Sequence, residues 1–322
     1  MIFCITVLRA LAAILITNSH YTGVYPTDII ANGELLGDVI FFAVSGFCLY
    51  NVKIGFGKWY LRRIARVYPA PIIITAVYML IGFYAAPQNI GEVVGWFIYP
   101  TNYHFVASIV LLYIPFYFVA KFEKLRKNIL WVMLGVLVAY LLVYIFVYDR
   151  SYYHIDNVRE PMIRFLFFIS MLLGAYFKQN FEEFKNKFRI WDLIIAFAVF
   201  VLYFITKIML SKAKMPSEFQ VINQAVLIAL LYMVMKCFAG IDSRLEKMPF
   251  PIKKIITLIS EITLEIYVVQ YAIIPRLAGC FGFPVNWIVI TGAILVSATL
   301  LHLCVKLVNK GTDKLFSGKG SV

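Results

Sequence analysis

The feature that most constrains this chain is a series of apolar runs, most about 20 residues long, separated by short polar connections. A helix of that length crosses the hydrocarbon core of a bilayer, which is about 30 Å thick. Of the 322 residues, 62% are hydrophobic and only 15% are charged, against about 25% charged residues in soluble domains. We therefore predict an all-α fold, a polytopic transmembrane bundle of about ten helices. The runs lie at 2–20, 36–52, 67–86, 104–120, 129–148, 161–177, 191–210, 219–239, 255–274 and 285–308.

Lys and Arg gather in alternate connections, which predicts an orientation. Counted with Asp and Glu, the connections on one side of the predicted bundle carry a net charge of +15, and those on the other side −1. The most basic connection, 53–66, holds five cations and no acid. Because cytoplasmic loops of membrane proteins are rich in Lys and Arg, we expect both termini in the cytoplasm. The connection 207–218, with Lys207, Lys212 and Lys214, is the exception.

Composition and spacing exclude several other classes. The net charge of +13 sits in short loops rather than in one basic domain, so we expect no nucleic-acid partner. The five cysteines lie in or beside apolar runs without CxxC spacing, so we expect neither a metal site nor disulfides. No basic segment precedes the first apolar run, so we expect no cleavable signal peptide. We predict one integral-membrane domain over 1–322 and no soluble domain.

The first predicted helix, VLRALAAILITNSHY at 7–21, carries an arginine and a histidine in an apolar setting. Arg9 and His20 are eleven residues apart, which is about three turns plus 20°, so both project from one face about 16 Å apart. Charged groups inside membranes are costly and are often functional. The alternative is structural, with Arg9 snorkelling to the inner interface and His20 in interfacial water. Spacing alone leaves both open.

The second predicted helix contains GDVIFFAVSGFCLY at 37–50. Ser45 and Gly46 form a small-residue break in an aromatic wall, which favours close helix approach or a kink. Ser45 lacks the G-x-S-x-G setting of a nucleophile, so we expect packing. Asp38, at the outer end of this helix, is expected either to pair with a cation such as His20 or to be solvated.

A basic cluster precedes the third predicted span, in KWYLRRIARVYPAPII at 58–73. Arg62, Arg63 and Arg66 are three or four residues apart and fall on one side of a helix. Arginine suits bidentate phosphate contacts, and this cluster lies on the predicted cytoplasmic side, where nucleotide cofactors are available. The alternative is contact with anionic lipid headgroups.

Five further ionisable residues are candidates for interior or outer positions. His104 and His154 are expected near the outer surface, either close to His20 or solvated. His302 is expected to be packed or hydrogen-bonded rather than catalytic. Glu261 and Glu265 are four apart on the ninth predicted helix. The arginines named above are their candidate partners, because buried charge is costly unless paired.

Three motifs, in order, resemble acyltransferase family 3, the polytopic membrane enzymes that O-acylate bacterial surface glycans and related acceptors. LRALAAILITNSHY fits the R-x10-H first helix of that family through Arg9 and His20. FFAVSGF follows in the second helix, and YLRRIARVYP matches the R-x-x-R element through Arg63 and Arg66. The resemblance spans nearly the whole chain, and the ten helices of the family agree with the predicted topology.

The resemblance implies roles for these residues. The family implies an acyl-CoA donor bound from the cytoplasm and an acceptor hydroxyl presented mostly on the outer side. His20 would be the catalytic histidine that acts on that hydroxyl, and Arg9 would be essential in the same helix. Arg63 and Arg66, with Arg62 beside them, would belong to the donor site and hold CoA phosphates.

The chain also departs from the family pattern. Asp38 lies three residues before the FF pair, where the family has an acid two residues before it, and one residue is about 100° of rotation on a helix. The glutamate that many members carry in the fourth helix has no counterpart after Ser108. Gln270 stands where many members have a histidine.

These features together predict an O-acyltransferase of the bacterial inner membrane. We expect it to move acetyl from acetyl-CoA to a hydroxyl of a cell-surface polysaccharide or of its lipid-linked precursor. Expected partners are the bilayer, acyl-CoA, the glycan acceptor and polysaccharide-biosynthesis machinery. One alternative is a transporter or exporter of a glycan or lipid-linked intermediate. Another is a non-catalytic assembly partner of a polysaccharide synthase.

Overall fold

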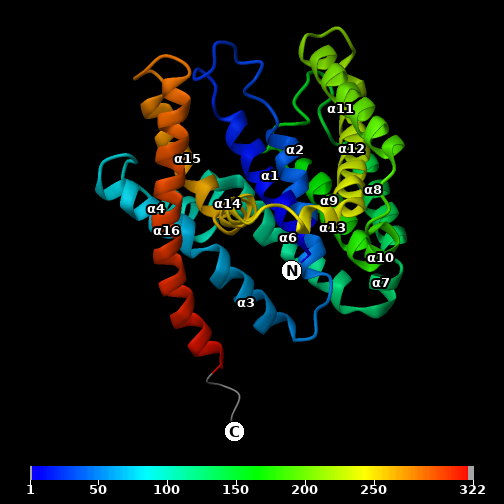
Figure 1. Ribbon diagram of the computed structural model, residues 1–322, viewed down its shortest axis with the longest axis horizontal. Coiled ribbons are helices and arrows are strands. Elements are labelled where there is room, and N and C mark those ends of the chain that lie inside the picture. Colours follow the sequence, from blue (N-terminus) through cyan, green and yellow to red (C-terminus); the bar gives the residue numbers. More distant parts are fainter. Residues whose placement is uncertain (1, 318–322) are drawn as a thin grey trace. The chain divides into compact units, whose positions relative to one another are not determined.

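The protein folds into helices, as a computed structural model shows (Figure 1). The structure describes residues 2–317, with side chains through residue 311, and within this part of the chain every regular element is helical. The all-α prediction is confirmed. Residues 318–322, the end of the predicted cytoplasmic tail, lie outside the described residues.

The longer helices are α1 (Phe3–Ser19), α2 (Glu34–Leu49), α3 (Phe56–Val67), α4 (Pro69–Leu80), α6 (His104–Lys121), α8 (Ile129–Phe146), α9 (Ile163–Gln179), α11 (Ile190–Ser211), α12 (Gln220–Gly240), α14 (Phe250–Glu261), α15 (Thr263–Leu277) and α16 (Val285–Ser317). Short turns of helix join them: α5 (Ile90–Val93), η1 (Val94–Ile98), η2 (Thr101–Tyr103), α7 (Glu123–Lys127), α10 (Phe181–Phe184), η3 (Ser217–Phe219) and α13 (Asp242–Glu246).

A helix is present at each of the ten predicted apolar runs. Among the described residues, six helical segments are long and apolar enough to cross a membrane, and a seventh is counted if the bent pair α14–α15 is one span. The chain is therefore a multi-pass membrane protein. The count of ten spans and the cytoplasmic location of both termini stay predictions. The three predicted spans with short helices are α1, α2 and α9, with 17, 16 and 17 residues.

The chain divides into two compact units. Unit 1 comprises Met1–Ala12, Leu35–Lys53 and Leu112–Thr257. Unit 2 comprises Ala13–Glu34, Ile54–Leu111 and the described residues from Leu258 onward. Both units consist of segments distant in sequence, so neither is a simple half of the chain. The prediction of one domain over 1–322 stays a prediction.

In unit 1, the short helices α2 and α9 are the most buried, and their backbones touch. A Cβ atom added to Gly46 of α2 would overlap the Met171 carbonyl of α9, and one added to Gly174 of α9 would overlap the Ala43 carbonyl of α2. This confirms the close approach predicted from Ser45 and Gly46. Since other helices surround them, α2 and α9 need neither the length nor the uniform apolarity of a lipid-facing span. α11 packs on α12, which also contacts α9, and α8 contacts α9 (Figure 1).

In unit 2, α15 packs against α4 and α16, and the basic helix α3 contacts both α4 and α16. The predicted span at 67–86 has other bounds in the structure: α3 and α4 together make a helical segment over Phe56–Leu80. The helix ends there because Gly82 has a φ of +75°, a conformation that favours glycine. Arg276 of α15 secures the turn, since its Nη2 donates to the Phe83 carbonyl at 2.6 Å and its guanidinium lies 4.0 Å from the Phe83 ring.

The predicted single helix at 255–274 is wrong. α14 and α15 meet at Ile262 with a bend of 71°. The Thr263 hydroxyl bonds to the carbonyls of Ile259 and Ser260, both at 3.0 Å, and side-chain bonds of this kind bend helices. Glu261 and Glu265 therefore lie on different helices rather than on one face.

The glycine contacts generate a stability test. Gly46→Ala or Gly174→Ala forces the backbones of α2 and α9 apart and is expected to cost about 1–3 kcal/mol or more. Thermal unfolding of the detergent-solubilised protein measures the loss. Gly135→Ala in α8 is the matched control, because a Cβ there meets nothing within 4 Å and alanine favours the helix by about 1 kcal/mol. Equal melting temperatures for all three variants would contradict the packing.

Candidate functional site

The end of α1 positions His20. α1 stops at Ser19, one residue before His20, which corrects the predicted continuation of the helix to residue 20. The last turn tightens, since the His20 N–H donates to the Thr17 carbonyl at 3.1 Å and the Tyr21 N–H to the Asn18 carbonyl at 3.2 Å. His20 thus lies at a helix terminus and not in mid-span.

Asn18 fastens the following loop, residues 21–33, to this helix end. Its Nδ2 donates to the carbonyls of Ile30 and Asn32 at 2.7 and 2.9 Å, and its Oδ1 accepts from the Tyr25 hydroxyl at 2.7 Å. One amide therefore holds two carbonyls near the end of the loop and a tyrosine near its start. The loop beside His20 is fixed by the helix that carries the histidine.

The His20 ring lies between an acid and an aromatic side chain. Its Nε2 is 3.8 Å from Oε1 of Glu34, the first residue of α2, a distance too long for a hydrogen bond but within reach of charge attraction. Tyr271 of α15 meets the imidazole edge-on, with ring centroids 5.0 Å apart. His20 Nε2 is buried and has no hydrogen-bond partner among the described residues. The acid and the aromatic ring thus flank an imidazole nitrogen that makes no hydrogen bond within the described part of the chain.

Aromatic rings continue from Tyr271 into unit 2. Tyr271 contacts Tyr267 and Tyr103 at centroid distances of 5.3 and 5.8 Å. The Tyr103 hydroxyl bonds to that of Thr75 at 3.1 Å, and the Tyr267 hydroxyl accepts from the Phe105 N–H at 3.3 Å. These bonds hold the rings in place, so that α4, α6 and α15 together form a rigid aromatic wall beside His20.

Arg9 lies in unit 1, in the first half of α1. Its side chain is half-buried, and Nη2 is 3.7 Å from the Cys48 sulfur of α2. This weak contact uses at most one N–H donor of the guanidinium, so most of its donors remain available among the residues that the structure describes. The roles predicted for Arg9 and His20 both stay predictions.

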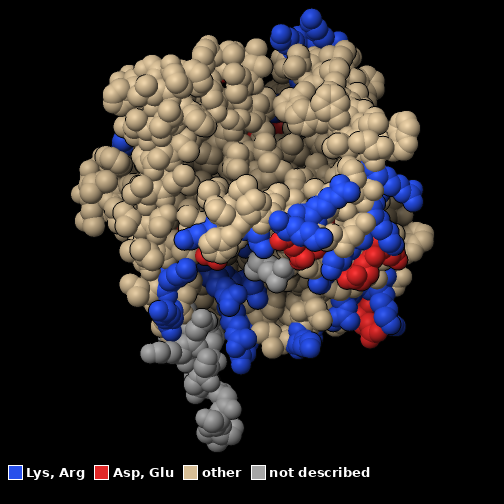
Figure 2. Space-filling model, in the orientation of Figure 1, with Lys and Arg blue, Asp and Glu red and all other residues tan. Residues whose placement is uncertain are grey.

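The arginine cluster lies on α3, as predicted. Figure 2 shows Lys and Arg side chains gathered over α3 and the neighbouring C-terminal part of α16. Arg66 is exposed, while Arg62 and Arg63 are half-buried, and the Arg63 guanidinium lies 5.8 Å from the ring of the buried Trp59. The three cations thus lie on one amphipathic helix. This position suits either a phosphate or a lipid headgroup as their partner.

Three other predicted ionisable residues have partners in unit 2. Nδ1 of His302 and Oε1 of Glu265 are 2.7 Å apart, which confirms that His302 is hydrogen-bonded. Glu261 lies 3.9 Å from Lys306 in an exposed pair, which contributes little to stability. His104 is half-buried at the start of α6.

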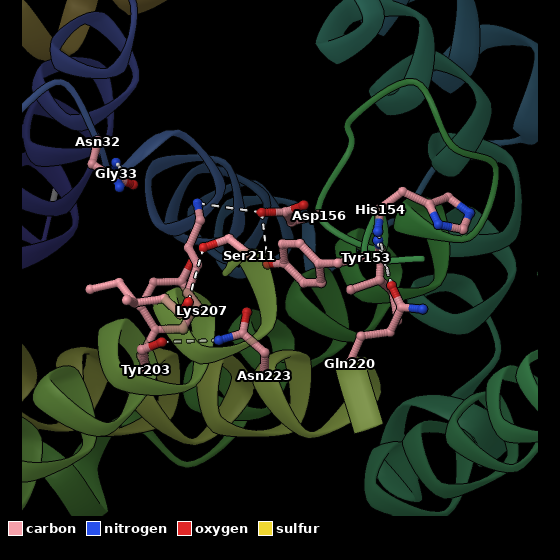
Figure 3. A network of polar contacts seen from close by, with 12 residues as sticks. Asn32, Gly33, Tyr153, His154, Asp156, Tyr203, Lys207, Ser211, Gln220 and Asn223 are labelled. Atoms are coloured by element: carbon pink, nitrogen blue, oxygen red, sulfur yellow. Dashed lines mark hydrogen bonds and ion pairs between the residues drawn. The ribbon is translucent and has the colours of Figure 1, made fainter. Parts of the chain in front are cut away.

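The remaining candidates lie in unit 1. Asp38 is 3% exposed, so the prediction that it might be solvated is wrong. His154 stacks between Tyr148 and Tyr152, with centroids 4.6 and 4.0 Å away. Lys207, which disagreed with the charge topology, lies on α11 and pairs with Asp156 at 3.4 Å (Figure 3). Its charge is therefore matched within the fold rather than left in a loop.

Sequence reasoning missed residues that the fold brings to His20. Glu34 and Tyr271 were not among the predicted site residues, and Gln270, next to Tyr271, is a departure from the family pattern. Glu34 follows a loop and Tyr271 lies on α15, and no spacing rule predicts their contacts with His20. Among the described residues, no group of three or more His, Cys, Asp or Glu gathers as metal ligands would.

Comparison with known proteins identifies the family. A family model described as an acyltransferase domain, that of acyltransferase family 3, matches residues 2–305. The chain belongs to acyltransferase family 3. No match was found among curated proteins or among solved structures. The acyltransferase assignment thus covers nearly the whole chain, including α1, the loop after it and α15.

The Asn18 contacts of this acyltransferase generate a test of local order. Asn18→Ala removes three hydrogen bonds of about 1 kcal/mol each, so the backbone amides of residues 22–32 are expected to exchange at least tenfold faster. Hydrogen exchange with mass spectrometry measures the change. Asn128→Ala is the control, since the Asn128 Nδ2 bonds the exposed Lys124 carbonyl of its own helix end. Unchanged protection of the loop in Asn18→Ala would contradict its anchoring role.

Proposed function

We propose that this membrane acyltransferase transfers acetyl from acetyl-CoA to a hydroxyl of a cell-surface polysaccharide or of its lipid-linked precursor. The family match over residues 2–305 carries the reaction class. His20, half-buried at the end of α1 with a buried Nε2 that makes no hydrogen bond among the described residues, supports the site. The proposal includes the bacterial inner membrane as location, with polysaccharide-biosynthesis machinery as a working partner.

The proposed step transfers the acyl group directly. The acceptor hydroxyl attacks the thioester carbonyl carbon, a C–O bond forms and His20 takes the hydroxyl proton. The C–S bond then breaks, and the CoA thiolate receives that proton from the imidazolium. The products are the O-acyl ester and CoA. General-base catalysis of this kind contributes about 10²–10⁴ to a rate.

The neighbours of His20 suit this role. The Glu34 carboxylate at 3.8 Å would stabilise the imidazolium as it forms, since opposite charges at this distance attract one another even near a protein surface. Tyr271 restricts the imidazole by edge-on contact. Arg9, predicted as essential, would act in the same helix from the donor side.

The donor would be held by the arginines of α3. CoA is too polar to cross lipid, so its nucleotide would remain on the cytoplasmic side while its thioester arm enters between helices. Arg63 and Arg66, with Arg62, offer planar guanidinium groups suited to phosphate oxygens. Their position on one amphipathic helix supports this role, although anionic lipid headgroups would bind the same arginines.

The first test follows labelled acetyl-CoA in membrane vesicles that contain the acceptor glycan. His20→Ala is expected to lower acetyl transfer about 100-fold to 10 000-fold, whereas His154→Ala, a control in the aromatic stack of unit 1, should stay within a few-fold of the parent. Glycan movement across the vesicles without any transfer by the parent would overturn the enzyme and favour a transporter. Unchanged glycan acylation in both Arg9→Ala and His20→Ala would favour an assembly partner.

The second test separates phosphate binding from lipid contact. Arg63→Ala and Arg66→Ala are each expected to raise the KM for acetyl-CoA about tenfold or more, because one charge-assisted hydrogen bond contributes about 1.5–3 kcal/mol. With S-acetylpantetheine, which lacks the nucleotide phosphates, the variants and the parent should have equal rates. Lys58→Ala, one turn from Arg62, is the control for general loss of positive charge. An equal loss with both donors would contradict phosphate binding.

A further inference from the structure

Several buried amide side chains of this protein are hydrogen-bonded at both their oxygen and their nitrogen. Gln220 and Gln224 on α12 are 0% and 1% exposed. Gln224 donates to the Ile155 carbonyl at 2.7 Å and accepts from the Tyr140 hydroxyl at 2.7 Å. Gln220 accepts from the His154 N–H at 3.0 Å (Figure 3) and donates to a carbonyl of the same loop at 3.2 Å. These residues follow the general rule for buried polar groups.

Gln270 on α15 breaks this rule. It is 0% exposed, yet neither Oε1 nor Nε2 has a hydrogen-bond partner among the described residues. An amide buried without bonds costs about 1–3 kcal/mol by mutational data. An unsatisfied buried group calls for an explanation, and a catalytic role in which a ligand supplies the missing bonds is one.

Thr17 on α1 is a second unbonded group. Threonine in a helix usually donates to a carbonyl four residues earlier, as Thr206 and Thr263 do. The Thr17 hydroxyl is buried and makes no hydrogen bond to any described residue. Two independent helices thus each present an unsatisfied polar group.

Both groups are neighbours in the chain of residues of the candidate site. Thr17 precedes His20 by three residues at the end of α1, and Gln270 precedes Tyr271, whose ring touches His20. A cavity of about 290 Å³ is lined by Thr17 of α1 and by Ile266 of α15. Ile266 is one turn before Gln270, and residues four apart share a helix face. The face of α15 that carries Gln270 therefore also forms part of the cavity wall.

We propose that Gln270 is a substrate-binding residue of the acyl-transfer site, which rests on the function proposed above. Its Nε2 donates to the carbonyl oxygen of the acyl group as negative charge develops there, and the Thr17 hydroxyl is the second donor. Donors placed in advance where charge develops stabilise a transition state, because they need no reorganisation during the reaction. His20 takes the proton of the acceptor, and these two groups hold the oxygen of the donor.

The test exploits the difference between a bonded and an unbonded amide. Gln270→Met keeps the length of the side chain but removes its hydrogen bonding. Because no bond of the resting protein is lost, its melting temperature should equal or exceed that of the parent, while kcat for acetyl transfer falls about 100-fold. Gln224→Met is the matched control, since it strips two bonds from a buried site and should lower the melting temperature by several degrees.

Each outcome decides the proposal. A melting temperature that falls in Gln270→Met as in Gln224→Met means that the amide has a structural partner, and the proposal is overturned. Unchanged stability and unchanged kcat in Gln270→Met overturn the proposal as well. In that case, a lower rate of transfer in His20→Ala would still support the proposed function. A parent enzyme without transfer from labelled acetyl-CoA overturns the function and this inference together.

Thr17→Val extends the test to the second donor. Valine has the shape of threonine without the hydroxyl, so stability should be kept and kcat should fall about tenfold or more. Thr263→Val is the control, because its hydroxyl bonds to its own helix at 3.0 Å and serves the bend rather than the site. A kcat for Thr17→Val equal to that of the parent removes Thr17 from the site and leaves Gln270 as the only donor.

Discussion

A polar group inside a membrane protein has no bulk water to bond with, and much of this structure depends on that constraint. Asp192 pairs with Lys236 at 2.8 Å, and Asp156 with Lys207 and the Tyr153 hydroxyl. Both ion pairs join segments that are distant in sequence. Lipid tails are as apolar as leucine, so apolar helices gain little by packing on one another rather than on lipid. Polar bonds of this kind therefore fix one arrangement of the helices.

The same constraint makes the exceptions informative. Gln270 has no bond at either end of its amide, and with Thr17 it stands out by its position next to residues of the candidate site. They lie on α1 and α15, around an imidazole that is itself unbonded at Nε2 among the described residues. An active site differs from the rest of the fold because a bound ligand, rather than the protein, completes its hydrogen bonds.

Sequence patterns predicted the helices well because apolar length is a local property. The approach of α2 to α9 also followed from local residues, since Gly46 removes the side chain that would block it. The bend at Ile262 was not predicted from the sequence. It depends on hydrogen bonds from Thr263 to the preceding turn, and a hydropathy pattern does not reveal such bonds. The candidate site was predicted only in part: the R-x10-H spacing found Arg9 and His20. Glu34 and Gln270 needed the tertiary fold, because nothing local marks an acid or an amide as close to a residue far away in the chain.

The length of α1 has a consequence for the bilayer. At about 1.5 Å per residue, its 17 residues extend about 25 Å, which is shorter than the hydrocarbon thickness of about 30 Å. A helix with this mismatch draws the lipid leaflets together around it or admits water at its ends. With α1 as the predicted first span, the two aqueous compartments would lie closer around it than elsewhere. Under the proposed function, this would shorten the path that a thioester from one compartment covers to meet a hydroxyl from the other.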